Sequence, residues 1–348
     1  MSGLLDRVTR RCAEHVEERL LRIALVEDIR QTVSFGAHVW ALTDPETEVG
    51  TSPFADVPQE AVRELPRLIR CRYLTLVNRW NTLEGPAASL LRATRGSPDA
   101  SLLYREVLAP FGVSDVATVM FRDRHGCWGW LDLWRFTGDD PFSDRDLAVL
   151  SAITVPVTEA LRRCQARSFD DPTPTPVRSG PVVLFLSPAL EVLAQTPETD
   201  AYLRTLLPPD ADQRPIPAGA YNVAGQLLAV EAGIDTQPPL SRVRLVGGVW
   251  LTFRAARVDS SAPEAERDIA VTIEPTTPAE RRLLYARSHA LSPREAELLD
   301  LLVEGADTKA VADALFLSQH TVQDHLKSIF AKTGAHNRRT LLTRVTGR

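Results

Sequence analysis

Cysteine and long apolar stretches are both scarce in this sequence. The 348 residues include four cysteines, which lie far apart and form no C-x-x-C pair, so neither a disulfide framework nor a zinc site is expected. No apolar stretch approaches the roughly 20 residues of a membrane-spanning helix, and charges interrupt the N-terminal segment too often for a secretory signal. The composition predicts a soluble, cytoplasmic protein with no membrane partner.

Catalytic motifs are missing as well. The sequence has no phosphate-binding G-x-x-x-x-G-K-[ST] loop, no G-x-S-x-G turn, no H-E-x-x-H helix and no glycine-rich dinucleotide fingerprint. No phospho-receiver pattern precedes the C-terminal segment. His320 and His325 lie five residues apart, whereas metal pairs on a helix usually lie three or four apart. We therefore expect no enzyme, no cofactor and no metal site.

Lysine is confined to the end of the chain. Only three of the 40 basic residues are lysines, and Lys309, Lys327 and Lys332 all lie in the last forty residues. This distribution fits either a compositional bias toward arginine or a need for flexible ammonium groups there. The whole chain has a net charge of −5, but residues 319–348 hold six basic residues against one acidic residue, a net +5. A local basic segment on an acidic chain is typical of a DNA-binding face.

The last sixty residues have the pattern of a helix-turn-helix. Ser292-Pro293-Arg294-Glu295 is a capping box with proline at the first helical position. A short helix is expected at about 308–315, followed by a tight turn at Phe316-Leu317. Ser318 then caps a third helix that ends at Thr333 before a glycine, and a fourth helix follows at about 338–345. This order predicts that the third helix enters the major groove of DNA.

This segment resembles the LuxR-type helix-turn-helix family over about residues 290–345. The matching motifs are Leu291-Ser292-Pro293-Arg294-Glu295, Gly305, Lys309-Ala310-Val311-Ala312, Ser318 through His325, and Ile329, Lys332, Gly334 and Arg338. Thr333 and Ala335 depart from the leucine and valine that are common in the family. The resemblance implies a homodimer on a two-fold-related site in double-stranded DNA, often with the fourth helix in the dimer contact.

The exposed side of the third helix carries side chains that can recognise DNA. Gln323 can pair with an adenine edge, Lys327 with guanine and Asp324 with cytosine. Other polar or basic groups lie where backbone phosphates could be met. The complete set of predicted DNA-binding residues is Lys309, Ser318, Gln319, His320, Thr321, Gln323, Asp324, Lys327, Lys332, Arg338 and Arg339.

The first half of the chain mixes helices and strands. One amphipathic helix is expected over 4–33, a strand within 38–42, and helices at 58–79 and 99–109. Two strands, 116–122 and 127–134, are joined by an Asp123–Gly126 turn, and Ser143 opens a closing helix. The stretch 116–164 resembles the end of a GAF domain.

Three tryptophans lie on the strand expected at 127–134. Trp128, Trp130 and Trp134 are expected on one face of the strand. Such a stripe is either a ligand-binding cage or, as is more common, a part of the core or of a dimer surface.

A second mixed block follows a proline-rich linker. Strands are expected at 182–186 and 191–194, helices at 197–207 and 217–232, and a hairpin at 241–254 around Gly247-Gly248, followed by a strand at 269–273. The order of these elements, two strands, then helices, then three antiparallel strands, resembles that of a PAS domain.

The predicted fold class is α+β multidomain, with GAF-like and PAS-like α/β sensor domains before an all-α four-helix LuxR-type domain. The expected boundaries are a GAF-like domain 1–167, a linker 168–181, a PAS-like domain 182–275, a connecting helix 276–290 and a DNA-binding domain 291–348. The predicted function is a one-component transcriptional regulator that responds to a small-molecule effector. The alternative is a DNA-binding regulator whose N-terminal region is a ligand-free dimerisation or protein-interaction platform.

Overall fold

The chain forms two compact units. The computed structural model describes residues 2–14, 17–170, 182–206, 217–244, 249–259, 261 and 263–347. The first unit comprises Met1–Ala160, Arg178–Val243 and Leu251–Glu274, and the second comprises Leu161–Val177, Arg244–Trp250 and Pro275–Arg348. The first unit contains most of both predicted sensor regions, whereas Leu161–Val177 and Arg244–Trp250 belong to the second unit. The boundary proposed between the two sensor regions within 168–181 stays a prediction. Within the described part of the chain, every helix is too short or too polar to cross a membrane.

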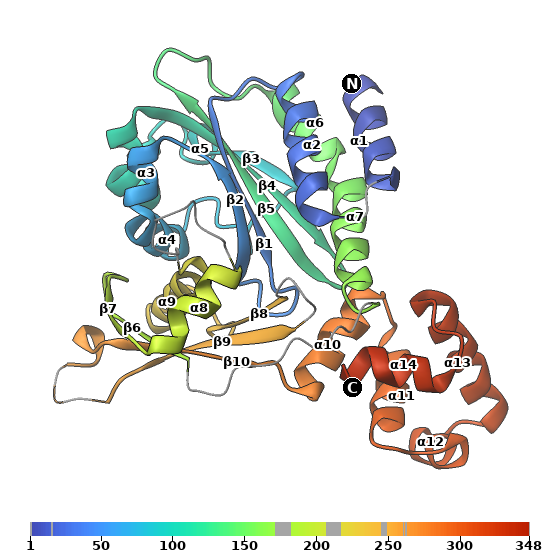
Figure 1. The fold of residues 1–348 in the computed structure, drawn as a ribbon. Helices are drawn as coiled ribbons and strands as arrows, with labels where there is room; N and C mark the ends of the chain where they lie inside the picture. The colour runs from blue at the N-terminus through green and yellow to red at the C-terminus, as the bar shows by residue number, and fades with distance from the viewer. Residues whose placement is uncertain are drawn as a thin grey trace. The chain divides into compact units, whose positions relative to one another are not determined.

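The first sheet, sheet A, has five strands in the order β2-β1-β5-β4-β3, and every neighbouring pair is antiparallel (Figure 1). Its strands are β1 (Ala37–Thr43), β2 (Gly50–Asp56), β3 (Ala87–Ser89), β4 (Val113–Asp123) and β5 (Gly126–Phe136). The expected hairpin of two strands joined near residue 124 is confirmed in β4 and β5. β2 was not predicted, because its Gly-Thr-Ser-Pro start lacks the alternation of a half-buried strand.

A bulge in β5 changes where its tryptophans lie. Phe121 pairs with Gly129 and Arg122 pairs with Cys127, so Trp128 has no partner residue in the ladder. Gly129 has a φ of +157°, and a Cβ there would lie 2.6 Å from the carbonyl oxygen of Ala41. Only glycine fits this close approach of two backbones. The bulge interrupts the two-residue alternation from which a single tryptophan stripe was predicted.

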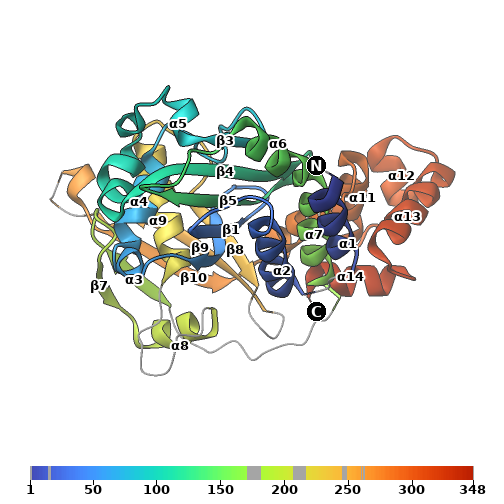
Figure 2. The same cartoon turned by 90° about the horizontal axis from the view of Figure 1, so that it is seen from above.

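Helices cover both faces of sheet A, as Figures 1 and 2 show. One face is covered by α1, α2 and α6, and α3, α4 and α9 (Ala218–Glu231) lie on the other side. The helices of this first half are α1 (Ser2–Glu14), α2 (Glu18–Arg30), α3 (Gln59–Arg63), α4 (Leu65–Leu74), α5 (Leu90–Ala93), α6 (Asp144–Ala152) and α7 (Thr154–Arg167).

Three helix predictions need correction. The helix expected over 58–79 is two helices, α3 and α4, and the second ends where Thr75 adopts an extended backbone. The single helix expected over 4–33 is two helices, because Glu17 adopts an extended backbone and its carboxylate caps the start of α2. The helix expected at 99–109 is an irregular helical stretch over 102–111, with a π-helical turn at Tyr104–Leu108 and a 3-10 turn at Ala109–Phe111, and a separate 3-10 turn at Pro98–Ala100 precedes it. The proline at the second position of the last turn removes a backbone donor, which limits a regular helix.

The second sheet, sheet B, also has five strands, in the order β7-β6-β10-β9-β8. Its elements are β6 (Val183–Leu186), β7 (Val192–Gln195), α8 (Pro197–Leu206), α9 (Ala218–Glu231), β8 (Leu240–Arg244), β9 (Trp250–Arg257), a 3-10 turn at Glu264–Glu266 and β10 (Ile269–Pro275). The strand and helix order expected for this block is confirmed. The predicted Gly247-Gly248 turn and most of the 168–181 linker lie outside the described residues.

Buried ion pairs join the sheet A and sheet B regions of the first unit. Arg79 lies 2.6 Å from Asp235, and Arg242 lies 2.7 Å from Asp44, with all four side chains at most 5 % exposed. α9 also packs against α4 and β2. The two mixed regions therefore form one continuous body, whereas their identity as GAF and PAS domains stays a prediction.

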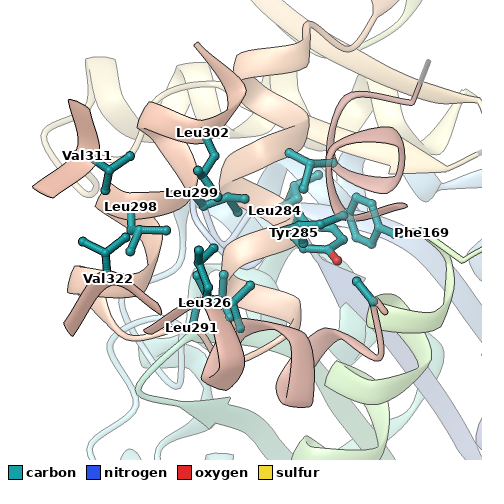
Figure 3. Close-up of a cluster of buried hydrophobic side chains, with 14 of the residues drawn as sticks. Phe169, Leu284, Tyr285, Leu291, Leu298, Leu299, Leu302, Val311, Val322 and Leu326 are labelled. Atoms are coloured by element: carbon teal, nitrogen blue, oxygen red, sulfur yellow. The ribbon is translucent and has the colours of Figure 1, made fainter. Parts of the chain in front are cut away.

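The second unit is a helical cluster around an aromatic and aliphatic core. Its helices are α10 (Pro278–Ser288), α11 (Pro293–Val303), α12 (Thr308–Leu315), α13 (Gln319–Thr333) and α14 (Arg338–Thr346). Phe169, which follows α7, is fully buried here, stacked on Trp250 and edge-on to Tyr285 with ring centroids 5.2 Å apart in both pairs. This core is shown in Figure 3.

Candidate nucleic-acid interface and a buried polar cluster

Side-chain caps define the helices of the predicted DNA-binding region. Ser292 and Glu295 form the predicted capping box at the start of α11. Ser318 accepts a hydrogen bond from the backbone N–H of Thr321 and so caps α13. Gly334, with a φ of +64°, ends that helix. The limits expected for these helices are therefore confirmed to within a residue or two.

Aliphatic side chains hold α11, α12 and α13 together. Leu298 and Leu299 of α11, Val311 of α12 and Val322 of α13 are fully buried, and they lie together in Figure 3. Because α13 buries only the side that carries Val322 and its neighbours at helical spacing, its opposite side is left to solvent. This is the arrangement of a helix-turn-helix.

The exposed side of α13 presents the side chains that were predicted to read bases. The side chains of His320, Asp324 and Lys327 are 85 %, 54 % and 74 % exposed. Asp324 lies 3.1 Å from the Lys327 ammonium and 3.6 Å from His320 Nε2. The hydrogen bond from Lys327 lowers the pKa of Asp324. These three groups are therefore oriented by one another before any partner is bound.

The other predicted contact residues are either exposed or joined by hydrogen bonds. Gln323 donates a hydrogen bond to the hydroxyl of Thr308 at 3.5 Å, and the hydroxyls of Ser318 and Thr321 are 2.9 Å apart. Gln319, Lys309 and Arg339 are exposed. These side chains are accessible to a partner, and their contacts with DNA stay predictions.

Lys332 and Arg338, which were predicted to meet phosphates, both make contacts inside the protein. The Lys332 ammonium lies 2.6 Å from the buried carboxylate of Glu295, and Arg338 donates a hydrogen bond to the carbonyl of Ala306 at 2.5 Å. Ser328 also donates to Glu295, at 2.6 Å. Phosphate contacts by Lys332 and Arg338 stay predictions, but each side chain has a structural role as well.

Glu295 is the centre of this internal network. Burial alone would raise its pKa, but hydrogen bonds from Lys332, Ser328 and Ser292 outweigh burial and lower the pKa to about 2. The local sequence pattern predicts Glu295 only as a capping residue. Its partner Lys332 lies 37 positions further along the chain, so no local pattern could reveal the pair.

The three candidate ligand-binding tryptophans are all buried. Trp128, Trp130 and Trp134 are 2 %, 6 % and 2 % exposed. Trp128 lies at the bulge, where its indole N–H donates to Asp123. Trp134 belongs to an apolar core, and Trp130 stacks on Trp80 with ring centroids 5.6 Å apart. None of the three therefore contributes to an exposed aromatic surface.

Trp130 belongs to a buried polar group of residues that the sequence did not reveal. We call Arg72, Trp80, Thr118, Trp130 and Asp132 the Arg72 cluster. The Arg72 guanidinium lies 3.2 Å from Asp132 and 4.7 Å from the Trp130 ring centre, and Thr118 donates to Asp132 at 2.6 Å. Burial raises the pKa of Asp132, against the opposing effects of Arg72 and Thr118.

Buried hydrogen-bond donors in this cluster and in the adjoining Asn78 have no acceptor in the described part of the chain. Among the residues that the structure describes, Arg72 Nε, Trp130 Nε1 and Asn78 Nδ2 are buried without a hydrogen-bond partner. Buried donors without partners are uncommon in native proteins, and each one needs an explanation. The three orphan groups are all donors, so acceptor atoms would complete the cluster.

The C-terminal segment belongs to a known family. Residues 289–345 match the family of bacterial regulatory proteins of the luxR type. This region is therefore a luxR-family helix-turn-helix domain, as the sequence motifs predicted. The family match covers the predicted DNA-contact helices α12 and α13 completely.

Two curated relatives match the same segment. The monoamine regulon transcriptional regulator of Klebsiella aerogenes is 43% identical over 54 residues, which are 16% of this chain and 24% of that protein. The spore germination protein GerE of Bacillus subtilis is 40% identical over 48 residues, 14% of this chain and 65% of that protein. The chain thus matches less than two thirds of the length of each. The first relative is named as a transcriptional regulator, and the family that residues 289–345 match is one of regulatory proteins.

Among solved structures, Escherichia coli SdiA aligns with 99% of this chain and 98% of its own. The sequence identity is 12% and the TM-score 0.36.

Proposed function

We propose that this protein is a sequence-specific DNA-binding regulator of transcription that acts in the cytoplasm. In this proposal, homodimers place α13 of each protomer in the major groove of double-stranded DNA. The observation that carries it is the exposed, mutually oriented set of polar side chains on α13, centred on Asp324 and Lys327, within a luxR-family domain. The net charge of +5 over 319–348 supports attraction to phosphate.

The proposal is tested by fluorescence anisotropy of the full chain on DNA from upstream of its own gene. Scrambled DNA of the same composition is the control, and both are titrated across a salt series. Saturable binding with a preference for the upstream DNA and a steep loss of affinity with salt is the expected result. Absence of any salt-dependent binding to either DNA would contradict the proposal.

We further propose that the first unit, with its GAF-like region 1–167 and PAS-like region 182–275, responds to a small-molecule effector. The unpaired donors of the Arg72 cluster support an effector that carries acceptor oxygens, such as a carbonyl or carboxylate compound. Such an effector would alter DNA binding by favouring one spacing of the two α13 helices over another.

The alternative, a ligand-free interaction platform, would be supported by exposed aromatic residues on β5. The burial of Trp128, Trp130 and Trp134 favours the effector hypothesis over this one. A screen of carboxylate and carbonyl metabolites by thermal shift and tryptophan fluorescence distinguishes the two. The interaction-platform alternative would be favoured if no compound stabilised the protein and if the first unit by itself formed the dimer.

A further inference from the structure

Phe316 is an exposed aromatic residue in a strained backbone conformation. It lies between α12 and α13, has a φ of +54° and a ψ of +43°, and is 95 % exposed. A bulky residue at positive φ is disfavoured, and glycine or asparagine would avoid the strain. Leu190 has a similar φ of +66° but is fully buried, so packing offsets its strain. The backbone of Phe316 caps the end of α12, where the N–H groups of Phe316 and Leu317 donate to carbonyls of that helix, but no packing among the described residues holds the exposed ring.

Phe316 lies shortly before the basic segment 319–348, which has a net charge of +5. The Arg294 guanidinium donates to the carbonyl of Leu315, directly before Phe316 in the chain. The first turn of α13 begins just after it, where backbone N–H groups lack intrahelical acceptors, and Ser318 satisfies only that of Thr321. The nearby acidic residues are Glu297, which pairs with Arg294 at 2.7 Å, and the exposed Asp313.

We propose that Phe316 packs against the deoxyribose of the DNA backbone at the edge of the half-site. This inference rests on the proposed DNA-binding function. The start of α13 would hold the adjacent phosphate through its free amides, and the Phe316 ring would cover the apolar surface of the sugar. A sugar–phosphate backbone offers apolar and anionic surfaces side by side, which matches an exposed ring beside a segment with a net charge of +5.

The test compares the full-length protein with Phe316→Asn on upstream and scrambled DNA across a salt series. Asparagine tolerates a positive φ, so the variant should unfold at the same temperature as the wild type or higher. The expected affinity loss is roughly tenfold. Both DNAs should be affected alike, and the salt slope should not change, because no ionic contact is lost.

Two further variants serve as controls. Phe316→Tyr keeps the ring and should bind like the wild type. Leu76→Asn removes another highly exposed apolar side chain, 76 % exposed in the first unit, and should leave DNA binding unchanged. If Phe316→Asn unexpectedly unfolds at a lower temperature, Phe316→Gly replaces it, because glycine adopts this φ without strain.

The outcomes separate this inference from the proposed function. If the wild type binds DNA and Phe316→Asn binds it with the same affinity, this inference is overturned and the proposed function stands. A loss confined to upstream DNA, or a flatter salt slope, would also overturn the assignment to the sugar. Wild-type protein that binds no DNA would overturn the proposed function and this inference with it.

Discussion

The two units each bury a carboxylate beside a cation, but the two sites differ in how completely they are satisfied. In the second unit, Glu295 receives hydrogen bonds from Lys332, Ser328 and Ser292, and its pKa falls to about 2. In the first unit, burial raises the pKa of Asp132 although Arg72 lies 3.2 Å away. Glu295 therefore gains from its surroundings, whereas Asp132 is held in surroundings that disfavour its charge.

The difference indicates different purposes. The Glu295 network joins α11 to α13 and fixes the orientation of the recognition helix, which is a structural task. The Arg72 cluster keeps Arg72 Nε and Trp130 Nε1 buried without acceptors, which reduces stability. Sites that lower stability in this way are often functional sites. The comparison supports an architectural role for Glu295 and an effector-related role for the Arg72 cluster.

The largest effect is expected from Asp132→Ala. Removing this carboxylate leaves the buried Arg72 charge unpaired, which should lower the unfolding free energy by about 3–5 kcal/mol. Urea denaturation followed by tryptophan fluorescence measures the loss. The combined change Arg72→Met with Asp132→Leu removes both charges and should cost much less. An equal loss in the single and the combined variants would show that packing, not the unpaired charge, determines the result.

Glu295→Ala should have a smaller effect, about 3 kcal/mol, which is the stabilisation that its lowered pKa represents. The Lys332 side chain is 36 % exposed, so its ammonium can reach water when the carboxylate is removed. Arg72, with a side chain only 4 % exposed, cannot do so. Circular dichroism of the helical transition measures this change. A loss as large as that of Asp132→Ala would contradict the distinction between the two sites.

The same carboxylate predicts a dependence of stability on pH. Its pKa is about 2 in the folded chain and 4.5 for an unperturbed glutamate, so its stabilisation is fully present above about pH 5. The stabilisation is lost as the pH falls from about 5 to about 2, because the unfolded state then binds the proton more tightly. Thermal unfolding across this range should show a weaker pH dependence for Glu295→Gln than for the wild type. Parallel curves would exclude Glu295 as a source of the effect.

The smallest effect is expected from Lys327→Ala, which should leave folding unchanged because the side chain is 74 % exposed. If Lys327 reads a base, specific DNA binding should weaken by about 1–3 kcal/mol. Anisotropy with upstream and scrambled DNA measures the change. Lys332→Ala is the matched control. It removes the ion pair with Glu295, so it should lower the unfolding free energy and leave the preference for upstream over scrambled DNA unchanged. Unchanged discrimination by Lys327→Ala would reduce Lys327 to a phosphate contact at most.

Local patterns predicted much of this fold. The capping boxes at Ser143 and Ser292, the β4–β5 hairpin and the helices of the luxR-family domain were expected from neighbouring residues, and the structure contains them. The division of the first helix at Glu17 and the bulge at Trp128 were not expected. Both arise where one residue leaves the regular backbone, and hydrophobic periodicity gives no signal of such a departure.

The sequence by itself determined where the DNA-binding helices begin and end and which side chains α13 presents. Caps, glycine stops and apolar spacing act over three or four residues, so they can be recognised directly. Only the tertiary structure decided which buried charges meet. Glu295 and Lys332 are 37 positions apart, and Arg72 and Asp132 are 60 apart. Such partners are selected by the packing of whole helices against one another or against a sheet, and short-range spacing carries no record of that packing.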